Sequence, residues 1–567
     1  MSVDLPSLLA TLLTKTDSQG KLIMYIKHTI ILWIEGEVYM KKHAIRMLLV
    51  FILLIGMTAC AEEPDSKQDD QSGADETASK SGDLVVDLAS DPVSLDPHAA
   101  NDGNSLYVMN AMYDTLVAWD TDLELQPALA ESLEQIEDTV WEAKIREDVT
   151  FHDDSELNAA VVKANLDRIL DPAMGSPLAF LFDMIESVEV IDDYTVHITT
   201  EYPFSALPLH LAHPGGHMIS LESIEADHEA MEKGDDPFAS VNEQPVGTGY
   251  FKYEERENGE FITLAKNEDY WGDEAQVDSV TFKVVPEDGT RIAELETEEA
   301  DIIYPVNAND IERIDQQDGT NVMQSDSASL TYLGMNTEVE PFDDVRVRQA
   351  IALAIDKDTV IKGVTDGVAL PANGPLAPTV FGYSDQIKPI DYDQEEAENL
   401  LKEAGYEDGF SATVLTNDRI TADLAEIVQA QLAEINIEID IEMIETGAYL
   451  EATGNGDMDM YVGSWGTVTM DADYGLYPMF HSENAGAPGN RSFYASDEVD
   501  ELLEQARQTT DEEERLDFYE SAQQIIIDEA PIVPIYHSVL LAGLRDEVQG
   551  FYQYPSSFPY LQEVRLD

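Results

Sequence analysis

"DSVTFKVVPEDGTRIAELETEEADII", residues 278–303, is the stretch that decides the fold. Residues 280–285 predict a β-strand, a turn follows, and residues 291–296 predict a short helix. Ile302 and Ile303 then predict a second, apolar strand. This order is typical of a βαβ unit, so the stretch indicates a mixed α/β protein.

Helical and strand patterns alternate over the rest of the chain. Residues 343–364 open with aspartates that can cap a helix and carry apolar side chains at helical spacing, and residues 393–405 end on Gly405, which suits a helix C-terminus. In residues 436–445 apolar and acidic side chains alternate, as in a strand with one buried face. No internal repeat interrupts this order, and an α/β protein of two lobes fits it.

The charge of the chain is extreme. There are 31 basic and 114 acidic residues among 567, a net charge of −83, yet 44% of residues are hydrophobic. Ordinary hydrophobicity argues against a disordered acidic chain and places the acids on a folded surface. That surface repels itself except in strong salt, where at 1 M the screening length falls to roughly 3 Å. We therefore expect adaptation to salty surroundings, and no binding of nucleic acid or of anionic lipid surfaces.

The only cysteine, Cys60, follows a signal-like segment. Basic residues precede the apolar residues 47–59, which are too few to span a bilayer, since a spanning helix needs about 20. Residues 57–60 resemble a bacterial lipoprotein processing site, so Cys60 is expected to become the lipidated first residue. This predicts an extracytoplasmic protein anchored to the cell membrane, at the cell surface or in the periplasm.

The segments around Cys60 divide the N-terminal region. Residues 1–39 contain no recognisable targeting segment, and Met40 is a natural start, so we expect an over-extended gene start. Residues 40–60 are the predicted lipoprotein signal peptide. Residues 61–82 are polar and acidic, and they predict a flexible tether.

Motifs for catalysis are absent from the sequence. There is no Walker-type phosphate loop, no complete zincin motif and no Gly-x-Ser-x-Gly elbow. His210, His213 and His217 form the one candidate metal site. Residues 214–216 (Pro-Gly-Gly) would break a helix there, and the alternative is a turn near a binding cleft with incidental histidines. We favour the turn, and predict no cofactor.

Four stretches carry a resemblance to a known family. They are "SLDPHAANDGNSLYVMNAMYDTLVAWD" (94–120), a Trp-led strand followed by "FHD" and a helix (141–170), "PVGTGYFKY" to "DYWG" (245–272) and "YLGMNTEVEPFDDVRVRQAIALAIDKDTVI" (332–361). Together they resemble the family 5 extracellular solute-binding proteins of bacterial ABC importers. That group takes up oligopeptides, dipeptides, glutathione and nickel chelates. The resemblance runs from about residue 83 to the C-terminus.

The resemblance implies a two-lobed periplasmic-binding-protein-like fold of the cluster C type, with an extra subdomain and the ligand between the lobes. The large lobe would comprise residues 83–305, with the extra subdomain at about 105–240, and residues 526–567 would return to it. The second lobe would be residues 306–525. Hinge closure around the ligand, followed by docking on ABC permease transmembrane subunits, makes such a protein a carrier and not an enzyme. A monomer is expected.

The resemblance also points to a ligand-binding loop in "GSWGTVTMDADYGLYPMF", residues 463–480. In peptide binders of this family an aspartate three residues past the tryptophan pairs with the ligand's α-amino group, and here that position is Val468. The pattern instead looks like the glutathione-binding branch. The candidate ligand-binding residues are Trp465, Thr467, Thr469, Asp471, Asp473, Arg491 and Tyr494.

Physical roles can be assigned to four of these candidates. Trp465 offers apolar area to cover a ligand. Asp471 or Asp473 would hold an ammonium group, and Arg491 a carboxylate. Two alternatives stay open: one of the two aspartates is a helix N-cap, and Arg491 belongs to a structural ion pair.

The predicted function is therefore a lipid-anchored substrate-binding protein that captures a small peptide, with glutathione as the preferred ligand, and delivers it to a permease. One alternative is a nickel- or metallophore-chelate-binding protein of the same family, with residues 210–217 contributing. An alternative of another class is a secreted peptide hydrolase, although no feature of the sequence indicates one.

Overall fold

The computed structural model describes residues 82–100 and 102–567. The predicted gene-start extension, the leader with Cys60 and nearly all of the tether lie outside the described residues. Ala78–Asp567 forms one compact unit. Within its described part, no helix is long and apolar enough to cross a membrane.

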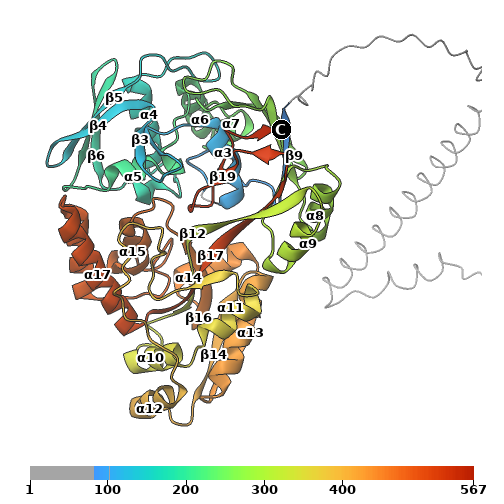
Figure 1. Cartoon of the computed structure of the whole chain (residues 1–567). Helices are drawn as coiled ribbons and strands as arrows, with labels where there is room; N and C mark the ends of the chain where they lie inside the picture. The colour runs from blue at the N-terminus through green and yellow to red at the C-terminus, as the bar shows by residue number, and fades with distance from the viewer. Residues whose placement is uncertain (1–81, 101) are drawn as a thin grey trace, which may run out of the picture. The chain divides into compact units, whose positions relative to one another are not determined.

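An eleven-stranded sheet runs through this unit (Figure 1). Its strands, in spatial order, are β15 (Ile437–Met443), β14 (Phe410–Thr416), β16 (Met460–Gly466), β12 (Thr320–Met335), β17 (Ile532–Arg545), β11 (Ile302–Tyr304), β1 (Asp83–Leu88), β10 (Ser279–Val284), β9 (Phe261–Lys266) and β8 (Phe251–Glu257), with β13 (Ala369–Pro371) paired to β17. The central strands β12 and β17 have 16 and 14 residues and pair antiparallel. They join a first half, from β11 to β8, to a second half, from β16 to β15.

The βαβ unit predicted from residues 278–303 is confirmed. β10, the helix α8 (Asp288–Glu296) and β11 follow one another as expected. β1 lies between the two strands and is parallel to both, with Val86 opposite Phe282 on one side and Ile302 on the other. The connection from β10 to β11 therefore passes over β1. Because β1 lies outside residues 278–303, this stretch alone could not predict its position between the two strands.

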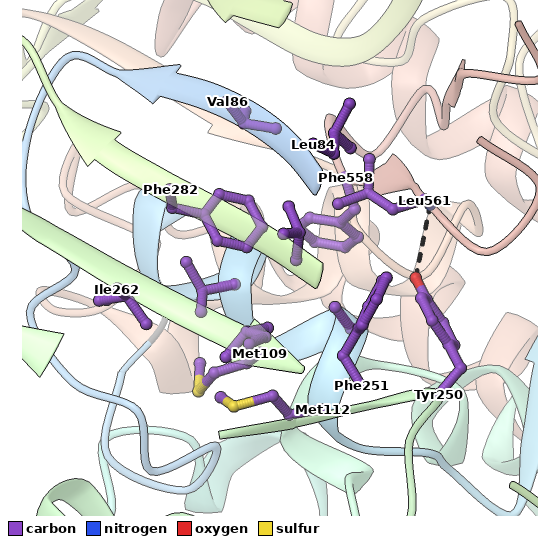
Figure 2. Packing of buried hydrophobic residues seen from close by; sticks show 14 of the residues in the cluster. Leu84, Val86, Met109, Met112, Tyr250, Phe251, Ile262, Phe282, Phe558 and Leu561 are labelled. Atoms are coloured by element: carbon purple, nitrogen blue, oxygen red, sulfur yellow. Dashed lines mark hydrogen bonds between the residues drawn. The ribbon is translucent and has the colours of Figure 1, made fainter. Parts of the chain in front are cut away.

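The C-terminal segment packs into the core of the first half, as Figure 2 shows. Leu84 and Val86 of β1 meet Met109 of helix α3 (Gly103–Met112) in the same cluster. The hydroxyl of Tyr250 accepts a hydrogen bond from the backbone N–H of Leu561 at 3.4 Å. Residues from both ends of the described chain thus stabilise one core. The C-terminal segment also forms the strand pairs β18 (Val548–Gln549) with β21 (Arg565–Leu566) and β19 (Tyr552–Gln553) with β20 (Pro559–Tyr560). Helix α9 (Ile311–Asp315) packs in a separate small cluster with α8.

The second half is built on a different set of helices: α10 (Val345–Leu353), α11 (Lys357–Val364), α12 (Gln394–Ala404), α13 (Arg419–Ala433) and α14 (Thr446–Asn455). α12 ends on Gly405 in the left-handed conformation, at φ 94°, as predicted. The continuous helical pattern of residues 343–364 is divided into two helices. The break has a local cause, because the Asp356 carboxylate accepts hydrogen bonds from the backbone N–H and the hydroxyl of Thr359 and so begins a new helix.

The strand predicted in residues 436–445 is also present, as β15. Ile437 and Ile439 are buried, but Met443 is 60% exposed. β15 is the edge strand of the sheet, so the alternating pattern ends in solvent there.

A smaller antiparallel sheet belongs to residues that precede β8 in the chain. Its strands, in order, are β4 (Ala130–Glu137), β5 (Val140–Ile145), β7 (Thr195–Thr200) and β6 (Ile185–Asp192). Helix α4 (Ala159–Leu170) covers it, and Trp141 and Phe151 lie in its core. The elements around this sheet are β2 (Val117–Trp119), β3 (Leu125–Pro127), α5 (Leu207–Leu211), α6 (Leu221–Lys233) and α7 (Ala239–Glu243). Three helices lie opposite it, α15 (Ala472–Phe480), α16 (Asp497–Gln508) and α17 (Glu512–Glu529) (Figure 1).

Candidate functional site

The loop predicted to bind ligand leaves the sheet at the end of β16 and enters α15. Trp465 is paired in register with Leu330 of β12. The Asp471 carboxylate accepts a hydrogen bond from the backbone N–H of Asp473 at 2.8 Å. Asp471 therefore occupies the N-cap position of α15, the role left open for one of the two aspartates.

Asp471 also forms a buried ion pair. Its two carboxylate oxygens accept hydrogen bonds from Nη1 and Nη2 of Arg515 at 3.0 and 2.7 Å. The guanidinium lies 5.2 Å from the ring centres of both Phe381 and Tyr519. Burial by itself lowers the pKa of Arg515, but the charge of Asp471, the neighbouring Tyr519 and the hydrogen bond to Asp471 together outweigh burial and raise it. This pair fixes the start of α15 against α17.

Asp473 is held by two partners. Arg507 donates to it through Nε at 2.8 Å and Nη2 at 3.3 Å, and His210 Nε2 lies 3.2 Å from its Oδ2. Burial alone would raise the pKa of Asp473, but the charge of Arg507 and the hydrogen bond to His210 hold it well below its usual range. The negative charge of Asp473 is therefore balanced inside the protein.

The same loop also contains three uncharged candidates, Trp465, Thr467 and Thr469. Trp465 Nε1 donates to the carbonyl of Tyr474 at 3.0 Å, and the two rings are 5.3 Å apart. Thr467 and Thr469 are buried, and the Thr469 hydroxyl has no hydrogen-bond partner among the described residues. The threonine side chains are thus internal, while the indole is partly exposed and packs on Tyr474.

A cavity of about 440 Å³ lies beside this loop, a volume typical of small-molecule sites. We call it the cleft cavity. It is lined from the side of the smaller sheet by Trp119, Ser205 and Leu209, and from the other side by Phe381, Met470 and the Asp471–Arg515 pair. Polar and charged groups therefore meet apolar surface contributed by both sides, as expected for a site that closes around a ligand.

Arg491 and Tyr494 lie away from the cleft cavity. Arg491 Nη1 donates to the carbonyl of Leu450 at 2.8 Å and to the Thr453 hydroxyl at 2.6 Å, which holds the end of α14. The Tyr494 hydroxyl donates to Glu529 at 2.6 Å. The structure therefore does not bring these two candidates together with Trp465 and Asp471.

The three histidines face different partners. His210 bonds to Asp473 and, through Nδ1, lies 2.8 Å from the Leu181 carbonyl. His213 Nδ1 accepts a backbone N–H, and His217 stacks on Tyr113. Burial lowers the pKa of His213 and of His217 to about 3. Among the described residues no group of three His, Cys, Asp or Glu side chains is placed to hold a metal ion.

Two residues of the site, Arg507 and Arg515, were not foreseen from the sequence. They lie on α16 and α17, far along the chain from the aspartates that they bind. The available signal was their scarcity, because basic residues number 31 against 114 acids. An arginine in such a chain has many acidic partners, however, and the sequence does not say which it takes.

Two features define the class of this protein. The long strands β12 and β17 join the two halves of the sheet, and the cleft cavity is lined from both sides. These are the features of a two-lobed α/β binding protein with its site between the lobes. The chain belongs to the bacterial extracellular solute-binding proteins, family 5, whose model "Bacterial extracellular solute-binding proteins, family 5 Middle" matches residues 124–487.

Relatives with names and solved structures agree with this. The glutathione-binding protein GsiB of Escherichia coli (strain K12) is 34% identical over 485 residues, which are 84% of this chain and 93% of that protein. The periplasmic binding protein DppA of Helicobacter pylori, solved with the peptide STSA, superposes with a TM-score of 0.77 at 31% identity, over 86% of this chain and 99% of that one. A dipeptide-binding protein from Pseudoalteromonas sp. SM9913, solved with Met-Leu, gives 0.76 at 25% identity, over 86% and 100%.

Proposed function

We propose that this protein is the substrate-binding component of an ABC importer, which captures a small peptide between its lobes and delivers it to the permease. Within that class, glutathione is the preferred ligand. Family membership carries the proposal, and the cleft cavity supports it. No catalytic step is needed for such a carrier.

The names of the relatives support the choice of ligand. GsiB is called glutathione-binding, and the two solved relatives hold short peptides. The pattern of residues 465–474, with Val468 where peptide binders carry an aspartate, supports glutathione over an ordinary dipeptide.

Contacts across the cleft support closure. The hydroxyl of Ser205 donates to the carbonyl of Thr509 at 3.0 Å. Arg507 Nη1 donates to the Tyr202 hydroxyl, also at 3.0 Å. Both bonds join residues near the smaller sheet to the C-terminal end of α16, so their making and breaking would accompany a hinge motion.

The remaining parts of the proposal concern the cell. Cys60 is proposed as the lipidated residue that anchors a monomeric body to the membrane, and the net charge of −83 as an adaptation to high salt. Metabolic labelling with a radioactive fatty acid tests the anchor, since the label should be lost in Cys60→Ser.

A thermal-shift panel tests the ligand. The full chain in 1 M KCl is heated with reduced and oxidised glutathione, di- to pentapeptides, and nickel with and without chelators. A ligand at one hundred times its Kd adds about 2.7 kcal/mol. We expect a shift with glutathione. A shift with ordinary peptides alone, or with nickel chelates alone, would overturn the choice of ligand.

A pair of variants ties that shift to the cleft cavity. Leu209→Trp places a larger side chain at the cavity wall and should abolish the glutathione shift. Leu450→Trp, at a position 47% exposed on α14, is the matched control and should keep it. Equal shifts in both variants would place the ligand elsewhere.

A further inference from the structure

A second cavity, of about 360 Å³, lies next to the cleft cavity and shares Trp119 with it. We call it the aromatic cavity. Its walls come from residues 110–128, 212–217, 250–271 and 554–563, and Val468 is the one contribution from the ligand-binding loop. This cavity is therefore largely a feature of the first half and has its own chemistry.

One wall is a continuous series of aromatic rings. Trp271 and Tyr270 have ring centres 5.3 Å apart, Tyr270 and Tyr250 6.0 Å, Tyr250 and Tyr560 6.5 Å, and Tyr560 and Tyr554 6.2 Å. All five residues line the cavity. Their mutual contacts fix the ring orientations before any ligand arrives, so little ordering is left for binding to supply.

Hydrogen bonds hold the hydroxyl ends of these rings as well. The Tyr554 hydroxyl donates to the Trp119 carbonyl at 3.0 Å, and the Tyr560 hydroxyl donates to Gln562 at 2.8 Å. The Tyr270 hydroxyl donates to Asp114 at 3.0 Å. Because the polar ends are already bonded, the rings offer the cavity mainly their π surfaces.

Asp114 is a carboxylate in the same wall, and its partners are neutral. Besides Tyr270, it accepts hydrogen bonds from the Thr248 hydroxyl at 2.8 Å and from Trp271 Nε1 at 2.9 Å. No lysine, arginine or histidine of the described chain forms an ion pair with it. Burial raises the pKa of Asp114, although these three donors oppose the rise. A cation brought by a ligand would meet an uncompensated carboxylate.

The rest of the lining does not oppose a cation. Asp120 and Glu563 add acidic groups, and no lysine or arginine is among the described lining residues. His217 adds no positive charge near neutral pH, since burial lowers its pKa to about 3. Arg146 is not a lining residue, but its guanidinium carbon lies 4.8 Å from the Trp271 ring centre. That ring face is therefore already used, and the tyrosine rings are left to meet a ligand cation.

We propose that the aromatic cavity is a second binding site, which takes an organic ammonium ion between the ring faces and the Asp114 carboxylate. Aromatic faces attract an ammonium group through the ring quadrupole, most strongly when water is excluded. The site stands independently of the proposed peptide site. The ammonium has two possible sources, a free organic cation or the amino end of a peptide.

Calorimetric titration of the full chain in 1 M KCl tests the site, with choline as the cation and 3,3-dimethylbutan-1-ol as its neutral isostere. Choline should bind at least tenfold more tightly than the alcohol. Asp114→Asn and Tyr560→Leu should each weaken choline binding at least tenfold, and Tyr560→Phe should retain it because the ring remains. Tyr392→Leu, at a position 50% exposed and outside the cavity, is the control and should match the original protein.

Three results would overturn the proposal: no choline binding up to 100 mM, affinity for the alcohol within threefold of that for choline, or unchanged choline affinity in folded Tyr560→Leu. Competition between choline and glycylglycine, but not its N-acetyl form, would identify the peptide amino group as the source. Lack of competition would identify a free cation. The thermal shift with glutathione is also measured in Asp114→Asn. Because Asp114 does not line the cleft cavity, this shift reports on the peptide site alone, and failure of one site can be told from failure of the other.

Discussion

Asp87 on β1 predicts an unusual dependence of stability on pH. Its side chain is fully buried, and neither carboxylate oxygen has a hydrogen-bond partner within residues 82–100 and 102–567. Lys283 Nζ lies 4.0 Å away, but that amine is bonded to Glu294. Burial, and next the charge of Glu294, raises the pKa of Asp87 from 3.8 to about 7.

The sign and size of the effect follow from linkage. With its pKa raised by folding, the native state keeps a proton that the unfolded chain releases, so stability falls as pH rises from 3.8 to about 7. At 1.36 kcal/mol for each pKa unit, the full decline is about 4 kcal/mol, of which about 3 kcal/mol falls between pH 5 and pH 8. Asp87→Asn removes this ionisation and with it the decline.

Urea unfolding at fixed salt, at pH 5 and pH 8, measures the difference. From pH 5 to pH 8, the free energy of unfolding of Asp87→Asn should rise by about 3 kcal/mol relative to that of the original protein. Asp301→Asn is the matched control, because Asp301 accepts hydrogen bonds from Arg545 and from the Val85 N–H. It should lose about 1–3 kcal/mol at both pH values. Parallel pH profiles for Asp87→Asn and the original protein would refute the reasoning.

Three further predictions concern the loop and the surface. Asp473→Asn should cost about 3–5 kcal/mol at pH 7, because it leaves Arg507 buried without its charge partner. Since the pKa of Asp473 is held below 3.8, this deficit should shrink in urea titrations as pH falls from 5 to 3, and a constant deficit would contradict the pair. Arg491→Ala should lower Tm but leave glutathione affinity unchanged, because Arg491 holds Leu450 and Thr453, and lost affinity in the folded variant would return it to the site. Raising KCl from 0.1 to 2 M should raise Tm through screening of the net charge of −83, whereas a flat Tm would exclude the proposed salt adaptation.

Local patterns in the sequence predicted most of the regular elements. β10, α8 and β11 follow from alternation and helical spacing within 26 residues, and Gly405 ends α12 as its backbone freedom requires. The helical spacing of residues 343–364 is confirmed, but the spacing did not show that Asp356 would cap a second helix and divide the stretch in two. The alternating pattern of β15 also did not predict that Met443 is exposed, because burial at the end of an edge strand depends on which segments lie next to it in space.

The candidate site was less accessible to sequence reasoning, because its contacts join distant segments. Asp471 and Asp473 were named, but their partners Arg515 and Arg507 lie 44 and 34 residues further along the chain. Arg491 was named as a carboxylate ligand or as a member of a structural ion pair, and in the structure it donates to the Leu450 carbonyl and the Thr453 hydroxyl of α14. The five rings in mutual contact in the aromatic cavity come from residues 250–271 and 554–560, and no spacing rule connects these two segments.

The two cavities meet at one loop. Val468 lines the aromatic cavity, Met470 lines the cleft cavity, and Trp119 lines both. Buried pairs to arginine anchor Asp471 and Asp473, so moving the loop would expose or separate paired charges at a cost of several kcal/mol. We infer that the loop is a rigid partition whose charges serve its own position. Val468 brings no charge to the aromatic cavity, whose acidic lining residues are Asp114, Asp120 and Glu563.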